Sequence, residues 1–94
     1  MARVSGGEAT TANVASSTSA VTLIAANSNR RNLVIMNDSS AVLYIKYGAA
    51  ASATSFTYKL AAGDTFEMPE NTYDGIVTGI WASENGAARV TEIT

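Results

Sequence analysis

The stretch LVIMNDSSAVLYI, residues 33–45, contains two apolar runs of four residues separated by a short polar segment. Each run contains Val and Ile, and the second also contains Tyr44; these residue types favour β-strands. The polar segment begins with Asn37 and Asp38, whose side chains can hydrogen-bond their own backbone in a turn. We therefore expect residues 33–36 and 42–45 to pair as a hairpin.

Both runs are apolar at every position, without the alternation of a sheet that has one face in water. The predicted strand pair should therefore be covered on both faces, one of them by the opposite sheet of a sandwich. For the second face there are three alternatives: it is covered by the loop of residues 49–57, by a neighbouring subunit, or by the rest of the monomer. Tyr44 lies in this pair and is a candidate contact with another subunit of a larger assembly.

From Ser19 onward, short runs rich in Val, Ile, Leu, Tyr, Phe and Thr recur about every ten residues between turn-forming residues. This spacing predicts an all-β fold, an antiparallel β-sandwich or jelly-roll-like barrel of about seven or eight short strands, with 19–94 as a single domain. Residues 49–53 are expected to form a loop with at most one helical turn. The predicted strands lie near 19–25, 31–37, 41–48, 54–60, 64–68, 75–83 and 87–93.

Asn85-Gly86 predicts a second hairpin, because these residues most readily take the positive φ angles of a type I′ turn. In the resulting register Trp81 faces Val90, and Ile80 faces Thr91. Paired residues share a face of the sheet, so Trp81 is expected to be a large part of the core and not a ligand-binding residue.

Residues 1–18 consist almost entirely of small and polar residues, and such a segment cannot bury enough surface to fold alone. We predict a polar N-terminal arm that docks as an added strand on a neighbouring subunit, through main-chain hydrogen bonds. Val4 and Val14 are its candidate contacts with another subunit of the assembly. The alternative is a frayed terminus without a role.

Hydrophobic residues make up 47% of the chain and charged residues only 15%, so the surface is expected to be rich in uncharged side chains. A surface of this kind offers little protection against association and indicates a homo-oligomer. The net charge of -2 and the lack of a basic cluster argue against nucleic acid as a partner. No apolar stretch approaches the ~20 residues of a membrane span, and the first eight residues are too polar for a signal peptide. We therefore expect no membrane partner and synthesis in the host cytoplasm.

The residues available for catalysis are few. The chain has no histidine and no cysteine, which removes the commonest general base and all thiolate chemistry. The carboxylates are scattered singly, mostly at predicted turns, and no spacing among them matches a calcium loop. We expect no enzyme activity, no metal and no cofactor.

Aromatic rings are the remaining candidates for a binding site, since sugars stack on exposed rings. Tyr73, beside Asp74 and Gly75, lies at a loop exit and is predicted to be an exposed contact. The other candidates are Tyr44, Tyr47, Tyr58 and Trp81, of which Trp81 is better explained as core.

Several segments resemble small virion proteins of tailed bacteriophages and prophages, and together they span about residues 19–94. The segment with the most specific resemblance is GIWASENGAARVTE, residues 79–92. The others are AANSNRRNLVIMNDS (25–39), LYIKYG (43–48) and ATSFT (53–57).

This resemblance implies a structural protein of the phage particle, most readily a head decoration (cement) protein that binds and stabilises the assembled shell. Its partners would be the major capsid protein or another virion protein, and its location the capsid surface of the virion. By analogy with threefold shell sites, a trimer is the favoured oligomer. The alternatives are a tail, neck or fibre component, or a carbohydrate-binding module for host attachment.

Overall fold

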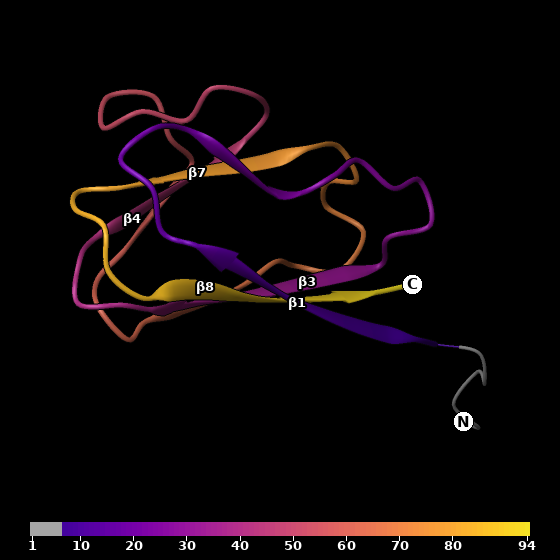
Figure 1. Cartoon of the computed structure of the whole chain (residues 1–94). Helices are drawn as coiled ribbons and strands as arrows, with labels where there is room; N and C mark the ends of the chain where they lie inside the picture. The colour runs from indigo at the N-terminus through magenta and orange to yellow at the C-terminus, as the bar shows by residue number, and fades with distance from the viewer. Residues whose placement is uncertain (1–6) are drawn as a thin grey trace.

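The computed structural model describes residues 7–94. These residues form eight strands in two antiparallel sheets (Figure 1). These residues contain no helix, which confirms the predicted all-β sandwich of about seven or eight strands. The strands are β1 (Ala9–Ala15), β2 (Val21–Ile24), β3 (Asn32–Asp38), β4 (Leu43–Tyr47), β5 (Tyr58–Leu60), β6 (Thr65–Glu67), β7 (Val77–Trp81) and β8 (Ala87–Ile93).

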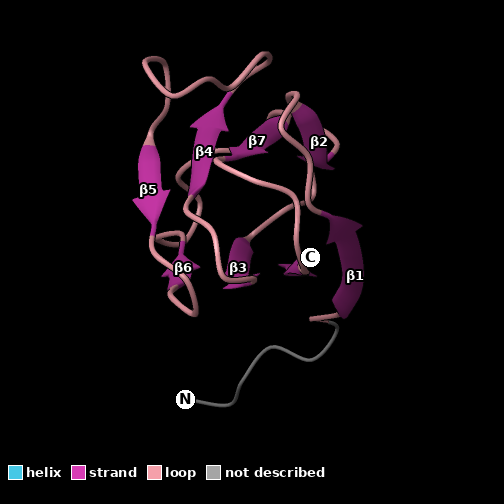
Figure 2. Ribbon diagram, turned by 60° about the vertical axis from the view of Figure 1, so that its left-hand side comes forward, coloured by secondary structure: helices cyan, strands magenta, loops and turns pink. Residues whose placement is uncertain are grey.

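The strand order is that of a jelly roll. One sheet has the order β1-β8-β3-β6 and the other β2-β7-β4-β5. The pairs β1 with β8, β2 with β7, β3 with β6 and β4 with β5 are nested, so the chain resembles one long antiparallel ribbon wrapped around the core. Figure 2 shows the two layers, with β2, β4, β5 and β7 above β1, β3 and β6.

The core lies between the sheets and follows the alternation of each strand. In β3, Leu33 and Ile35 are fully buried, and in β4, Leu43 and Ile45 are fully buried. The intervening residues point outward, and Met36 is 36% exposed. The expectation that this strand pair is covered on both faces is therefore wrong for β3, whose outer face reaches the surface.

The predicted hairpin at Asn37–Ser40 does not form, because β3 and β4 belong to opposite sheets. Asn37 is the inward-facing residue near the end of β3 and is fully buried. The residues between Asp38 and Leu43 cross from one sheet to the other, a gap of ~10 Å in a sandwich.

The predicted Asn85-Gly86 hairpin is also wrong. Trp81 pairs with Leu43 in one sheet, while Val90 pairs with Ile35 in the other. A type I′ turn needs positive φ at both central residues, and of the two only Gly86 has it, at 69°. Residues 82–86 instead bridge the sheets, so Trp81 and Val90 are buried on opposite walls of the core.

Strand β1 was not among the predicted strands and lies within the segment expected to be an arm. It pairs with β8 over its whole length, from Ala9 with Ile93 to Ala15 with Ala87. Six of its seven residues are exposed, and only Val14 is half-buried. The segment does extend along a sheet edge, as predicted, but the edge belongs to its own chain.

Candidate interaction surface

The outward face of β4 carries a group of partly exposed apolar side chains around Tyr44. In the sheet, Tyr44 lies between Lys59 of β5 and Ile80 of β7. Phe56, from the loop before β5, packs against Tyr44 with ring centroids 5.0 Å apart and an angle of 55° between the planes. The Lys59 ammonium lies 5.9 Å from the centre of the Tyr44 ring, within reach of a cation–π interaction. We call these four residues, Tyr44, Phe56, Lys59 and Ile80, the Tyr44 surface.

The loop that supplies Phe56 is attached to the sheet at both ends. At its start, the Thr78 hydroxyl donates to the Gly48 carbonyl at 2.7 Å and accepts from the Ala51 amide at 3.1 Å. At its end, the Thr57 amide donates to the Ile45 carbonyl at 2.6 Å. Since main-chain contacts hold both ends, Phe56 remains 40% exposed at a defined position.

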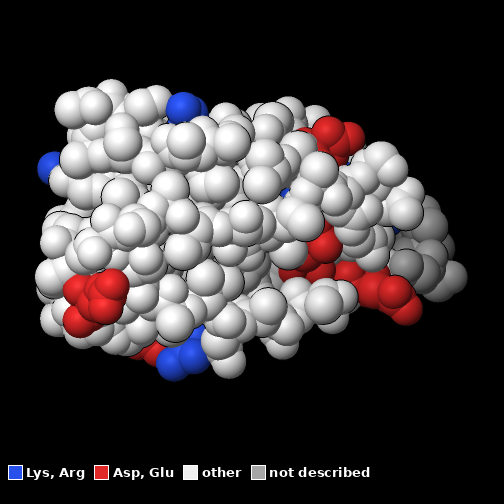
Figure 3. Space-filling model, turned by 45° about the horizontal axis from the view of Figure 1, so that its top comes forward, with Lys and Arg blue, Asp and Glu red and all other residues white. Residues whose placement is uncertain are grey.

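The charged side chains on the strands of the sheet that carries the Tyr44 surface have one sign. The four strands of its sheet contain both lysines of the chain, Lys46 and Lys59, and no Asp or Glu. The acidic residues after Gly7 lie in the other sheet or in connecting segments. Figure 3 shows a face of the molecule on which uncharged atoms predominate and charged side chains form small separate patches. The Tyr44 surface therefore suits an uncharged or acidic partner surface.

A second aromatic group closes the end of the sandwich between the edge strands β5 and β6. Tyr58 packs on Phe66 across the two sheets, with ring centroids 4.3 Å apart. Tyr47 stacks on Tyr73 with centroids 4.8 Å apart and planes 6° from parallel. The Tyr47 hydroxyl is buried without a hydrogen-bond partner among the described residues. Burial, and secondly the neighbouring Tyr58, raise the pKa of Tyr47 above its usual value.

This arrangement places Tyr73 differently from the exposed contact that its loop position predicts. One face of its ring is covered by Tyr47, and its hydroxyl donates to the Ile76 carbonyl at 3.0 Å. Tyr73 is half-buried and packs against the core. Its hydrogen bond and its stacking partner are both structural.

Of the two arm residues, Val14 packs inward against the core and lies opposite Ala88, while Val4 falls outside the described residues. Neither Val14 nor Tyr73 adjoins the Tyr44 surface in sheet pairing or in ring contacts. Among the four predicted contact residues, Tyr44 is the one that lies at an exposed aromatic group.

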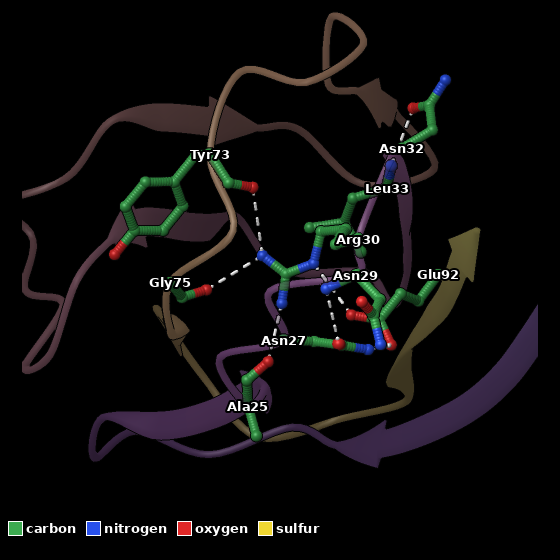
Figure 4. A network of polar contacts seen from close by, with 9 residues as sticks. All are labelled: Ala25, Asn27, Asn29, Arg30, Asn32, Leu33, Tyr73, Gly75 and Glu92. Atoms are coloured by element: carbon green, nitrogen blue, oxygen red, sulfur yellow. Dashed lines mark hydrogen bonds and ion pairs between the residues drawn. The ribbon is translucent and has the colours of Figure 1, made fainter. Parts of the chain in front are cut away.

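A buried ion pair between Arg30 and Glu92 lies beside the second aromatic group, since Arg30 also binds the main chain of Tyr73 (Figure 4). The Arg30 Nε donates to Glu92 at 2.8 Å, and its other two nitrogen atoms donate to the carbonyls of Tyr73, Gly75 and Ala25. Each guanidinium nitrogen is therefore engaged with the protein. The network ties two connecting segments, between β2 and β3 and between β6 and β7, to β8. Breaking such a buried pair by removing one partner is costly.

A shallow polar pocket of about 300 Å³ lies beside this network. Arg30 and Asp74 contribute to its wall, but the Arg30 donors point to main-chain carbonyls and Glu92. The protein itself therefore satisfies the Arg30 guanidinium. The remaining residues that line the pocket are Ser28, Asn71, Thr72 and Tyr73.

Residues 7–94 contain no group of three or more His, Cys, Asp or Glu side chains close enough to hold a metal ion. No helix long and apolar enough to cross a membrane occurs in the same residues. Comparison of the chain with protein-family models, curated proteins and solved structures found no match.

Proposed function

We propose that this chain is a structural subunit of a tailed-phage particle, a decoration protein that binds the major capsid protein of the assembled shell through the Tyr44 surface. The observation that carries the proposal is the aromatic pair formed by the exposed Phe56, on its loop, and the half-buried Tyr44 of β4, flanked by Lys59. Aromatic side chains of this kind are enriched in the central contacts of protein interfaces.

The sequence resemblance to small virion proteins and the jelly-roll topology support the same proposal. Jelly rolls occur in viral capsid proteins, although they also occur in lectins and other proteins, so topology alone is an analogy. The resemblance supports the major capsid protein as the partner. The geometry of the residues around Tyr44 supports that surface as the docking site.

Binding to the assembled lattice gives this subunit a stabilising role. A ligand that binds the assembled state and not its separate parts shifts the equilibrium toward assembly by mass action. A decoration protein that spans neighbouring capsid subunits therefore raises the temperature at which the shell comes apart. The protein would be located on the capsid surface of the virion.

Binding of the purified chain to empty shells tests the proposal, with Phe56→Ser as the variant and Met36→Ser as the matched control. Phe56 and Met36 are 40% and 36% exposed, on the outer faces of opposite sheets. We expect Phe56→Ser to weaken shell binding at least about tenfold, the effect of ~1.4 kcal/mol. Met36→Ser should bind like the unchanged chain.

The experiment tests the decoration role and the binding surface separately. Failure of the unchanged chain to bind shells would contradict the decoration role. Equal binding by all three proteins would contradict the Tyr44 surface but not the role.

The alternatives predict other results. A tail, neck or fibre component would be present in few copies per particle, whereas a decoration protein would be present in many. A carbohydrate-binding module would bind glycans through an exposed ring. One face of the Tyr73 ring is covered by Tyr47, which makes Tyr73 less suited to such stacking than the sequence suggests.

A further inference from the structure

The outer edge of β1 has a complete row of open main-chain groups. The Ser16 amide donates to the Gly86 carbonyl, and the Thr94 amide donates to the Glu8 carbonyl. Hydrogen-bonded pairs alternate along an antiparallel ladder, so the even-numbered residues of β1 bond to β8. The N–H and C=O groups of Ala9, Thr11, Asn13 and Ala15 point away from the sheet and have no partner within residues 7–94.

The three other sheet edges each have a feature that hinders pairing with another chain. Strands β5 and β6 are three residues long and carry Lys59 and Glu67, respectively. Strand β2 has four residues and a register irregularity between Thr22 and Ile24. Short length, charge and bulges are the usual ways in which proteins protect sheet edges.

Strand β1 has none of these features. Its sequence ATTANVA is seven residues long, with no charged residue, proline or glycine. Its register with β8 is continuous from Ala9 to Ala15. Figure 2 shows the strand at the margin of its sheet, and six of its residues are exposed. An exposed, long and uncharged edge of this kind is a template for pairing with a further strand.

The edge is also complementary to itself. In an antiparallel pair centred on Ala12, Ala9 faces Ala15 and Thr11 faces Asn13 of a second copy, which uses all four pairs of open main-chain groups. Thr10 then faces Val14, and Ala12 faces its own copy. No like charges oppose each other, because Glu8 would lie opposite Ser16.

We propose that β1 pairs antiparallel with β1 of a second copy of this chain, so that two four-stranded sheets join into one about a two-fold axis at Ala12. Such a contact is isologous and forms a closed dimer. This proposal replaces the trimer expected from composition and is independent of shell binding, because it concerns the free protein.

Cysteine cross-linking tests the register, since the chain has no cysteine of its own. Residues that face each other in a non-hydrogen-bonded antiparallel pair have Cα atoms about 4.5 Å apart, a distance that a disulfide spans. We expect Ala12→Cys to form a disulfide-linked dimer on mild oxidation. The matched control is Thr10→Cys on the same face of β1, which would face Val14 and should remain mostly unlinked.

Sedimentation of Thr11→Pro and Thr11→Val tests the pairing without cysteines. The Thr11 N–H points away from β8, so proline removes no hydrogen bond of the monomer but blocks the outer edge. We expect the unchanged chain and Thr11→Val to dimerise at micromolar concentrations, and Thr11→Pro to dimerise at least about tenfold more weakly. Circular dichroism checks that Thr11→Pro retains the β fold.

Three results would overturn the proposal. These are a monomer or trimer for the unchanged chain, equal dimerisation by folded Thr11→Pro and Thr11→Val, and cross-linking of Thr10→Cys as fast as Ala12→Cys.

Discussion

Asn37 is the polar centre of the core. Its amide nitrogen donates to the carbonyls of Ala41, Leu60 and Ala61, and its amide oxygen accepts from the Ser39 hydroxyl at 2.7 Å and the Trp81 indole at 3.2 Å. A buried amide of this kind is costly unless its hydrogen bonds are made. Here they join both sheets and two connecting segments at one fully buried side chain.

Trp81 is among the fully buried side chains and is the largest of them, so the predicted burial is correct although the hairpin register behind it is wrong. Trp81→Ala should lower the free energy of unfolding by about 3–5 kcal/mol, because it leaves a cavity and removes the donor to Asn37. Trp81→Phe retains most of the volume and should cost less. Urea denaturation measures both, and an unchanged unfolding midpoint for Trp81→Ala would contradict the assignment to the core.

Tyr47 should make the fold sensitive to alkali. Its pKa is raised in the folded state, chiefly by burial, so above its ordinary value of 10.0 the unfolded chain loses this proton first. Stability is therefore retained below pH 10 and falls as the pH rises through the raised pKa of Tyr47. Tyr47→Phe removes this contribution, and at neutral pH it should cost little because the hydroxyl has no partner within residues 7–94.

Thermal unfolding between pH 8 and 11 compares Tyr47→Phe with the unchanged chain. Tyr44→Phe is the control, at a tyrosine whose ring packs on Phe56 and not on Tyr47. An equal alkaline loss for Tyr47→Phe and the unchanged chain would show that Tyr47 does not contribute.

At the level of elements, most strands could be predicted from the sequence, but their pairing could not. The run at residues 87–93 coincides with β8, and the runs near 31–37 and 41–48 contain most or all of β3 and β4. Residue types and turn spacing indicate where strands lie. They do not indicate which strands pair, because Asn, Asp and Gly occur both in hairpins and in connections between sheets. Strand β1 was missed because its stability comes from main-chain pairing with β8 and not from large apolar side chains.

The connection between β7 and β8 depends on Gly86. A Cβ atom at this position would meet the Asp38 carbonyl oxygen and lie 2.8 Å from the Ser39 Cα, and the residue has a φ of 69°. Gly63 also has positive φ, at 82°, but a Cβ there meets nothing within 4 Å. Gly63→Ala should therefore cost about 1 kcal/mol from backbone strain alone, and Gly86→Ala roughly twice that or more.

Chemical denaturation of the two glycine variants measures this difference. Equal losses of stability would contradict the close approach of the 82–86 connection to the turn after β3.

At the scale of the whole molecule, the jelly roll brings the two lysines and the exposed aromatic pair to one sheet and leaves the long edge of β1 open in the other. Tyr44 could be selected from the sequence as a contact, but Phe56 could not, because the loop carries it back over β4 only in the folded chain. Tyr73 was predicted to be exposed because the sequence does not show which distant residue covers its ring. In the folded chain, Tyr47 stacks on it.

The central claim is that this chain is a shell-bound structural subunit, and a cryo-electron microscopy map of the intact particle tests it most directly. The account predicts many copies of the two-sheet fold on the outer surface of the shell, with Tyr44 and Phe56 turned toward the major capsid protein. A particle whose shell surface lacks this fold, or one that carries it in a few copies at the tail, would contradict the account.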